Sequence, residues 1–434
     1  MKKSIAFLIT IVFIFLFDIS CNTSRNGELE ANNTIGSATT SLAAGENFIL
    51  RLLSDGSLYV YSSDVSEGGY EPFPVTKFIA IDANNERAAA INREGKLYYW
   101  ENASYADLTD VVTYPLDDKV IDVSIGDSHI GVVIINGSIF TWGNNHYDQL
   151  GLRADEIEQD YFTPMKLTQA EGLIFEKIEC GISSTIAKTK SGELYEWGYF
   201  DTPITDSYVQ SGYIGIPTAI NFNENSSIVD MESGFFFDVL LTSGGDLYSR
   251  GRNDYYQCQP SEDIYINDFT KINLSEPIMN FSVGANHVIA LGRTGNVYAW
   301  GSNNYGQLGI PVSKTEKPRR IDLNEKINAV AALEACSVFI SNGVLLTTGL
   351  NADTILGSNP KESQIQPLIT SSIQTPSIDP EFIHIRSGYS ISAAVDKEKQ
   401  VYIWGDSWNG CLGNESIRDI SSPQLLSLPV PTLQ

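Results

Sequence analysis

Residues 126–151 read GDSHIGVVIINGSIFTWGNNHYDQLG, and residues 284–309 read GANHVIALGRTGNVYAWGSNNYGQLG. The two stretches align without a gap: each opens on a Gly 16 residues before a Trp, and each has a second Gly five residues before that Trp. The same offsets fit eight places in the chain, where the Trp position holds Tyr61, Trp100, Trp142, Trp197, Arg250, Trp300, Thr348 and Trp404. The sequence is therefore a tandem array of eight units, with successive Trp positions 39 to 56 residues apart.

Each unit has the pattern of a β-hairpin, with an apolar run before a tight turn and aromatic or β-branched residues after it. Glycine supplies the positive φ that such turns need, and the turn residues are Gly56, Gly95, Gly137, Gly192, Gly245, Gly295, Gly343 and, in the eighth unit, Lys399. Most units have room for two further short strands. We therefore predict an all-β fold, a closed β-propeller of four-stranded blades, with eight blades and seven as the alternative.

The two quoted segments resemble repeats of the regulator of chromosome condensation family, whose pattern is G-x-x-H, an apolar strand, a G turn, an aromatic-W-G and then N-x-x-G-Q-L-G. The resemblance covers residues 45–434, most clearly in the third, sixth and eighth copies. It implies a β-propeller, typically seven-bladed, with a binding or scaffolding role. One family member exchanges nucleotide on a nuclear GTPase, and another, exported by bacteria, inhibits β-lactamases. An exported chain never meets a cytosolic GTPase, so the resemblance here points to an exported bacterial member.

The last repeat is followed by residues 422–428, which resemble the outer strand that leads into a next unit. We expect this strand to pair with the first blade and close the ring, which would remove the free sheet edges.

The N-terminus predicts export. Lys2 and Lys3 precede an apolar run over residues 5–17, too short to span a membrane, so residues 1–20 are a predicted signal peptide. Residues 21–44 are small and polar and are expected to form a flexible tether, followed by one propeller domain over residues 45–434.

The residue after the signal peptide is Cys21, preceded by Ser20, as in the bacterial lipoprotein signal that this stretch resembles. We expect Cys21 to carry lipid and to hold the protein at the cell envelope. Asp18 departs from that signal, and ordinary secretion is the alternative.

The chain has 28 Lys and Arg against 53 Asp and Glu, a net charge of −25 that repels phosphate backbones and anionic lipid. We expect no nucleic-acid partner and no membrane contact beyond the lipid anchor. The acidity suits a basic protein partner or divalent cations, or it only keeps an exported protein soluble.

Neither the cysteines nor the histidines form a metal-ligand pattern. The cysteines after Cys21 are far apart, and we expect buried free thiols at Cys180, Cys258, Cys336 and Cys411. His129 and His287 share a repeat position and are expected to bond neighbouring backbone, while His146 is a loop residue and His384 a strand residue. Trp142, Trp197, Trp300 and Trp404 are expected to pack between blades. No metal and no cofactor is expected.

The candidate ligand-binding residues lie in one repeated loop. Aromatic residues occur five residues after the Trp position, or four in the last copy, at Tyr105, Tyr147, Tyr255, Tyr305 and Trp408, and Asp148 and Asp254 lie beside them. Because the loops are equivalent, we expect these residues to lie on one face of the disc. Aromatic residues are favoured at protein interfaces. The alternative is that this turn only packs each blade. The insertions at residues 155–160 and 199–213 are expected to be solvated loops.

No G-x-S-x-G elbow, phosphate-binding glycine loop or H-E-x-x-H motif occurs, so no catalytic residue is assigned. We predict a monomeric cell-envelope or secreted binding or scaffold protein that recognises a protein or glycan through its loop faces. The alternatives are an extracellular polysaccharide hydrolase or lyase, since loop carboxylates could form an acid/base pair, and a purely structural surface protein.

Overall fold

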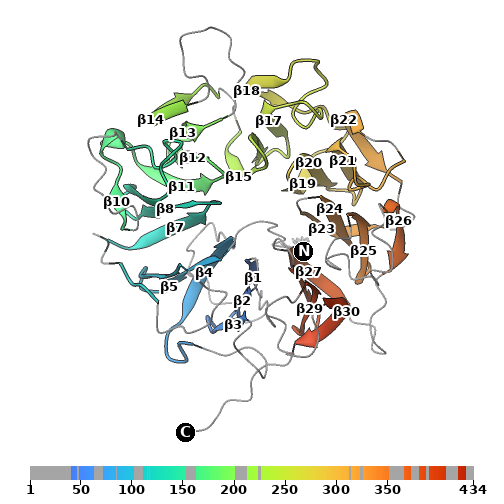
Figure 1. The fold of residues 1–434 in the computed structure, drawn as a ribbon, viewed down its shortest axis with the longest axis horizontal. Helices are drawn as coiled ribbons and strands as arrows, with labels where there is room; N and C mark the ends of the chain where they lie inside the picture. The colour runs from blue at the N-terminus through green and yellow to red at the C-terminus, as the bar shows by residue number, and fades with distance from the viewer. Residues whose placement is uncertain are drawn as a thin grey trace, which may run out of the picture.

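Eight antiparallel sheets surround a common axis in the computed structural model, and each sheet forms one blade of a β-propeller (Figure 1). The described residues are 41–45, 48–62, 72–84, 86–101, 111–114, 116, 118–152, 163–200, 213–222, 226–311, 314–322, 326–333, 335–350, 366–372, 381–387, 391–406 and 419–426. The eight blades expected from the repeats are confirmed, and the seven-blade alternative is wrong. The predicted signal peptide lies outside the described residues.

The blades are numbered 1 to 8 in chain order, and in each the strands follow one another from the axis outward (Figure 1). Blades 1 and 2 have three strands each among the described residues: β1 (Ser41–Ala44), β2 (Phe48–Leu52) and β3 (Leu58–Ser62); β4 (Phe78–Asn84), β5 (Arg87–Asn92) and β6 (Leu97–Trp100). Strand β1 lies within the range expected to be tether.

Blades 3 to 8 have four strands each. Blades 3 to 5 are β7 (Val120–Ile125), β8 (His129–Ile134), β9 (Ile139–Gly143) and β10 (Met165–Lys166); β11 (Phe175–Cys180), β12 (Ser184–Thr189), β13 (Leu194–Tyr199) and β14 (Tyr213–Ile220); β15 (Ile228–Ser233), β16 (Phe237–Thr242), β17 (Leu247–Arg252) and β18 (Tyr265–Lys271). Blades 6 to 8 are β19 (Ile278–Val283), β20 (His287–Gly292), β21 (Val297–Ser302) and β22 (Lys314–Ile321); β23 (Ile327–Ala332), β24 (Cys336–Ser341), β25 (Val344–Gly349) and β26 (Gln366–Ser372); β27 (Phe382–Ser387), β28 (Ile391–Asp396), β29 (Val401–Asp406) and β30 (Asp419–Leu426).

Helical structure among the described residues is limited to one 3-10 turn, η2 (Thr168–Ala170). Within that part of the chain, no helix has the length and apolar character needed to cross a membrane.

The turn between the second and third strands of each blade has the conformation expected from the sequence. The seven turn glycines have φ between 81° and 94°, and Lys399 in blade 8 has φ 66°. At Gly137 a Cβ would lie 2.6 Å from Ile174 Cγ2 of blade 4, and the Gly137 carbonyl accepts the Phe175 amide at 3.0 Å. The glycine therefore allows both the turn and a close backbone contact with the next blade.

The core consists of layers between neighbouring blades, and we call each such interface a seam. The side chains of Trp142, Trp197, Trp300 and Trp404 are completely buried. Trp197, for example, lies in one cluster with Val133 and Ile139 of blade 3 and Ile178 of its own blade. The expected packing role of these tryptophans is confirmed.

The ring closes in a different way from the one expected. Strand β30 pairs with β29 of its own blade, with Leu425 opposite Tyr402, and so completes blade 8 rather than blade 1. The expectation that residues 422–428 pair with the first blade is wrong because β1 already serves as the inner strand of blade 1.

The seam between blades 8 and 1 closes the ring by face-to-face packing. Leu42 and Tyr61 of blade 1 lie in one cluster with Ile385 and Trp404 of blade 8. The buried guanidinium of Arg51 donates a hydrogen bond to the Lys399 carbonyl, and so makes the contact that backbone amides make at other turns.

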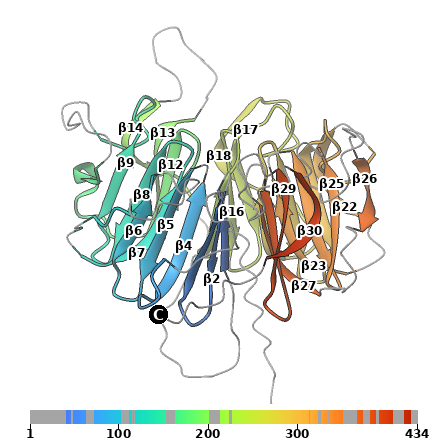
Figure 2. The ribbon, with the colours of Figure 1, turned by 60° about the horizontal axis from the view of Figure 1, so that its bottom comes forward.

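The strands run between two faces of the disc (Figure 2). One face, the turn face, carries the glycine turns. The other, the loop face, carries the loop before the second strand and the loop after the third strand of each blade. These two loops are joined in the same blade by backbone bonds such as Asn144 N–H to Ser128 O and Tyr199 N–H to Ser183 O, both 2.8 Å.

Candidate functional site on the loop face

The turn that follows the third strand is the same in blades 3, 5 and 6. The amide of a tyrosine donates to the side-chain oxygen of a buried Gln two residues later, in the pairs Tyr147–Gln149 (2.8 Å), Tyr255–Gln257 (2.9 Å) and Tyr305–Gln307 (3.0 Å). The tyrosine rings point outward: Tyr147 is 41% and Tyr305 44% exposed, and Tyr255 is half-buried. The glutamine thus packs the turn, while the tyrosine is displayed on the loop face.

In blade 3 this tyrosine belongs to an aromatic group that extends over blade 4. The ring of Tyr147 stacks on Tyr199 with centroids 5.5 Å apart and lies 6.2 Å from Tyr213, with interplanar angles of 30° and 26°. Tyr199 and Tyr213 are opposite residues in the β13–β14 register, with centroids 4.9 Å apart. Phe236 of blade 5 packs edge-on against Tyr199 at 5.7 Å. We call Tyr147, Tyr199 and Tyr213 the tyrosine patch.

Asp148 borders the tyrosine patch. A Cβ placed on Gly215 would lie 3.7 Å from Asp148 Oδ2, and Gly215 is two residues from Tyr213 on the same face of β14. Burial raises the pKa of the Asp148 carboxyl above its usual value. Its φ of 58° is a left-handed conformation that Asp and Asn adopt more readily than other side chains.

The structure brings Tyr147 and Asp148 together, but the other predicted residues lie apart from them. Asp254, in blade 5, forms an ion pair with Arg252 at 2.9 Å and 3.1 Å. Tyr255 and Tyr305 lie on blades 5 and 6. Tyr105, Trp408 and Cys21 lie outside the described residues.

Tyr199 and Tyr213 are the residues that sequence reasoning missed. They were assigned to the ends of a solvated insertion, but they are the last residue of β13 and the first of β14. The signal that could have found them is the occurrence of a tyrosine at both ends of the insertion, since cross-strand aromatic pairs commonly stabilise the base of a long hairpin loop.

Beneath this region, the seam between blades 4 and 5 holds a buried arginine. Arg250 occupies the Trp position of blade 5, and its guanidinium lies 2.5 Å from Glu196 of blade 4 and 3.3 Å from Asp238. The guanidinium also lies over Phe269 at 4.7 Å and over Phe200 at 5.4 Å. Burial raises the pKa of the Asp238 carboxyl, and the positive charge of Arg250 partly offsets this increase.

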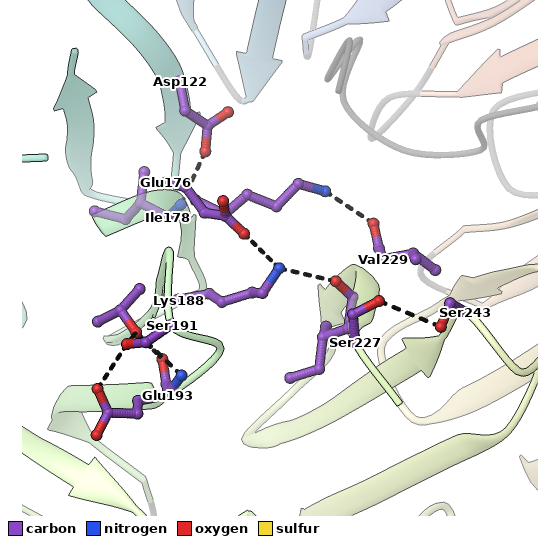
Figure 3. Close-up of polar contacts among 12 residues, drawn as sticks. Asp122, Glu176, Ile178, Lys188, Ser191, Glu193, Ser227, Val229 and Ser243 are labelled. Carbon is purple, nitrogen blue, oxygen red and sulfur yellow. Dashed lines mark hydrogen bonds and ion pairs between the residues drawn. The ribbon is translucent and has the colours of Figure 1, made fainter. Parts of the chain in front are cut away.

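The same seam is bridged by lysines near the turn face (Figure 3). Lys188 Nζ lies 2.5 Å from Glu176 Oε1 and donates to the Ile228 carbonyl of blade 5 at 3.0 Å. Lys177 Nζ donates to the Val229 carbonyl at 2.9 Å. Charged side chains therefore connect blades 4 and 5 at both ends of the seam.

His129 and His287 have the structural role expected from their repeat position. His129 Nε2 bonds Thr185 Oγ1 of blade 4 at 2.8 Å, and His287 Nε2 bonds Ser337 Oγ of blade 7 at 3.0 Å. Both partners are hydroxyls of the next blade, and a backbone hydrogen bond of Cys336, also in the next blade, acts on His287 as well. Burial lowers the pKa of both imidazoles to about 3.

Metal-ligating side chains do not gather in the described part of the chain: no group of three or more His, Cys, Asp or Glu there could hold an ion. Cys180, Cys258 and Cys336 are buried free thiols, as expected, and Cys411 lies outside the described residues. His146 is exposed in its loop, and His384 lies on β27.

Eight blades built from one hairpin repeat and arranged around a common axis define a repeat β-propeller. Sequence profiles described as the Regulator of chromosome condensation (RCC1) repeat match residues 136–187 and 294–340, and a second RCC1 profile matches residues 280–307. The resemblance expected from the sequence is thus confirmed at these residues, which match repeats of this family.

Relatives with this repeat include whole proteins and parts of larger ones. The chain is 25% identical over 327 residues to human E3 ubiquitin-protein ligase HERC2, covering 67% of this chain but 7% of HERC2. It is 26% identical to the Ultraviolet-B receptor UVR8 of Arabidopsis thaliana, covering 54% of this chain and 55% of UVR8. The mouse Regulator of chromosome condensation is 24% identical, with 71% and 77% covered.

Solved structures share the fold. Prp20p from Saccharomyces cerevisiae superimposes with a TM-score of 0.58 at 22% identity, covering 73% of this chain and 80% of Prp20p. Human WBSCR16 gives a TM-score of 0.58 at 18% identity, covering 74% and 84%. At these identities the likeness shows the propeller fold alone.

Proposed function

We propose that this propeller is a binding or scaffold module that recognises a protein through the loop face of blades 3 to 5. The observation that carries the proposal is the tyrosine patch: Tyr147 and Tyr213 are more than one-third exposed, whereas the repeat tryptophans are completely buried. Exposed, clustered tyrosines are typical of the centre of protein interfaces.

The shared fold supports a protein as the partner rather than a glycan. Prp20p, which has this fold, binds Gsp1p and histones. The proposal concerns binding alone, because the ligase and receptor activities of the relatives belong to proteins that this chain matches only in part.

The proposed location is the cell envelope, outside the cytoplasm. It rests on the N-terminal sequence: the apolar run over residues 5–17 and Cys21 with Ser20 before it. A lipid at Cys21 would tether the propeller through residues 22–40, and would leave the loop face accessible to other envelope proteins.

Hydroxyl-radical footprinting of the full chain, with and without an envelope extract, tests the proposal. We expect Tyr147 and Tyr213 to become protected in a saturable manner, while Ile174 and Val344, exposed on the turn face, do not change. Protection confined to the turn face would refute the proposed site. Release of new products from envelope polysaccharide would instead favour a hydrolase or lyase, and no saturable protection at all would favour a structural protein.

A further inference from the structure

We propose that the tyrosine patch binds an arginine side chain of a basic partner segment, with the Asp148 carboxylate as its counter-ion. The inference rests on the proposed function, because it names the chemistry of the partner at the same surface.

The rings of the patch are arranged to take a planar cation. Tyr147 lies within 30° of parallel to both Tyr199 and Tyr213, at 5.5 Å and 6.2 Å, and the outer rings Tyr147 and Tyr213 remain accessible to solvent. A guanidinium stacks on aromatic faces and is less strongly hydrated than an ammonium group, so arginine gains more than lysine from such a surface.

Asp148 provides a carboxylate that the described residues leave unpaired. No hydrogen bond or ion pair reaches its side chain within the described part of the chain, whereas Asp254, next to the equivalent turn of blade 5, is held by Arg252. Burial without a partner raises the pKa of Asp148, and a bound cation would reverse that effect.

The protein contains the same combination of groups in its own interior. Arg250 lies over Phe269 and Phe200 and is bonded to Glu196 and Asp238. An arginine held by aromatic faces and a carboxylate is thus a stable arrangement in this seam, and the patch directly over blade 4 offers the same groups without the arginine.

The charge of the whole chain favours the same class of partner. Salt screens the net charge of −25 at distances beyond a Debye length. Close to the surface, the same charge raises the local concentration of a basic segment. A neutral glycan gains nothing from this charge, and an acidic partner is repelled.

Fluorescence anisotropy with the full chain at physiological salt tests the inference. The probes are a labelled oligo-arginine peptide, the same peptide with citrulline in place of arginine, and an oligo-lysine peptide. We expect affinity in the order arginine, lysine, citrulline. Tyr147→Leu and Asp148→Asn should each weaken arginine binding about threefold to tenfold.

The variants are chosen to separate the patch from general charge. Asp148→Asn keeps a residue that tolerates the left-handed φ of 58°, so the turn is retained. Asp268→Asn, at an exposed position of β18 in blade 5, removes the same charge outside the patch and should leave binding unchanged.

Three results would overturn the inference: equal binding of the citrulline peptide, an equal loss in Asp268→Asn and Asp148→Asn, or no peptide binding in the wild type. In each case, footprinting of the loop face by an envelope partner would still support the proposed function. If the arginine peptide binds but no envelope partner protects the loop face, the proposed function is refuted and the arginine site is still supported.

Discussion

Blades 3 and 4 are joined in one way, and blades 4 and 5 in another. Between blades 3 and 4, the Gly137 turn presses against Ile174, His129 bonds Thr185, and Trp197 fills the core. These contacts are apolar or use neutral hydrogen bonds, and the buried Asp122 carboxylate of blade 3 also accepts the Ile178 amide of blade 4 at 2.8 Å. Gly137, His129 and Trp197 stand at repeat positions, and Ile174 and Thr185 are their contacts.

Between blades 4 and 5, charged side chains add to an apolar cluster that includes Ile186 and Met231. The equivalent turn glycine, Gly192, has no described atom within 4 Å of a Cβ placed on it, so it lacks the close contact that Gly137 makes with the next blade. Lys188 and Lys177 reach the Ile228 and Val229 carbonyls instead, and Arg250 replaces the tryptophan of blade 5.

The difference teaches that departures from the repeat occur together in space. Arg250 and its partner Glu196 lie in the same seam as the lysine bridges, and Tyr199 of the tyrosine patch contacts Phe236 of blade 5. Apolar packing tolerates the loss of one contact, whereas a buried ion pair depends on both partners being present. The site that we propose for a partner thus borders a seam that departs from the repeat.

The largest effect is expected at Arg250. Arg250→Met leaves Glu196 and Asp238 buried without their cation, which costs about 3–5 kcal/mol of unfolding free energy for a buried pair. Denaturant unfolding followed by tryptophan fluorescence measures this loss.

The triple variant Arg250→Met, Glu196→Gln, Asp238→Asn tests the cause of that loss. It removes the unpaired charges as well, so it should recover most of the stability lost in the single variant. An equal loss in both variants would show that Arg250 acts through packing on Phe269 and Phe200 instead.

The sequence predicted the elements of the fold because its signals are local. A turn residue at a fixed offset from the Trp position marks one hairpin, and the eight turn positions, Gly in seven units and Lys399 in the eighth, give eight blades with positive φ at each turn. Burial of the tryptophans follows from the same register.

The sequence could not predict which blade a strand joins or which rings meet. Strand β30 has the pattern of an outer strand, and that pattern is the same whether it pairs with β29 or with blade 1. Likewise, Thr185 lies 56 residues from His129, and Tyr213 lies on a different blade from Tyr147. These contacts depend on how neighbouring blades are placed, which no local pattern records.

A smaller effect, dependent on pH, is expected at His129 in the seam between blades 3 and 4. Burial, and to a lesser degree the charge of Arg87, lowers the pKa of folded His129 to about 3, below the value of about 6.5 in an unfolded chain. Between these values the unfolded chain binds a proton that the folded chain does not. The contribution of His129 to stability is therefore complete above about pH 6.5 and is lost as pH falls toward 3.

His129→Gln removes that titration. We expect a loss of about 1–3 kcal/mol at pH 7, since Thr185 and the packing around the ring lose a partner, and a smaller loss at pH 4. Unfolding curves at the two pH values measure it, and His287→Gln in the equivalent seam of blades 6 and 7 should behave alike. An equal loss at both pH values would contradict the neutral, buried state of the imidazole.

The smallest effect is expected at Lys188. Its dependence on salt concentration distinguishes the seam of blades 4 and 5 from the seam of blades 3 and 4. Lys188→Met removes the ion pair with Glu176, which is about one-third exposed, and the bond to the Ile228 carbonyl, so the expected loss is about 1 kcal/mol or less. Because salt screens a partly exposed ion pair, this loss should shrink as salt is raised, whereas the loss in His129→Gln, which breaks a neutral buried hydrogen bond at neutral pH, should stay constant. Unfolding of both variants across a salt series measures the contrast. A loss in Lys188→Met that salt does not change would mean that Lys188 stabilises the protein through its bond to the Ile228 carbonyl of blade 5 rather than through the ion pair within blade 4.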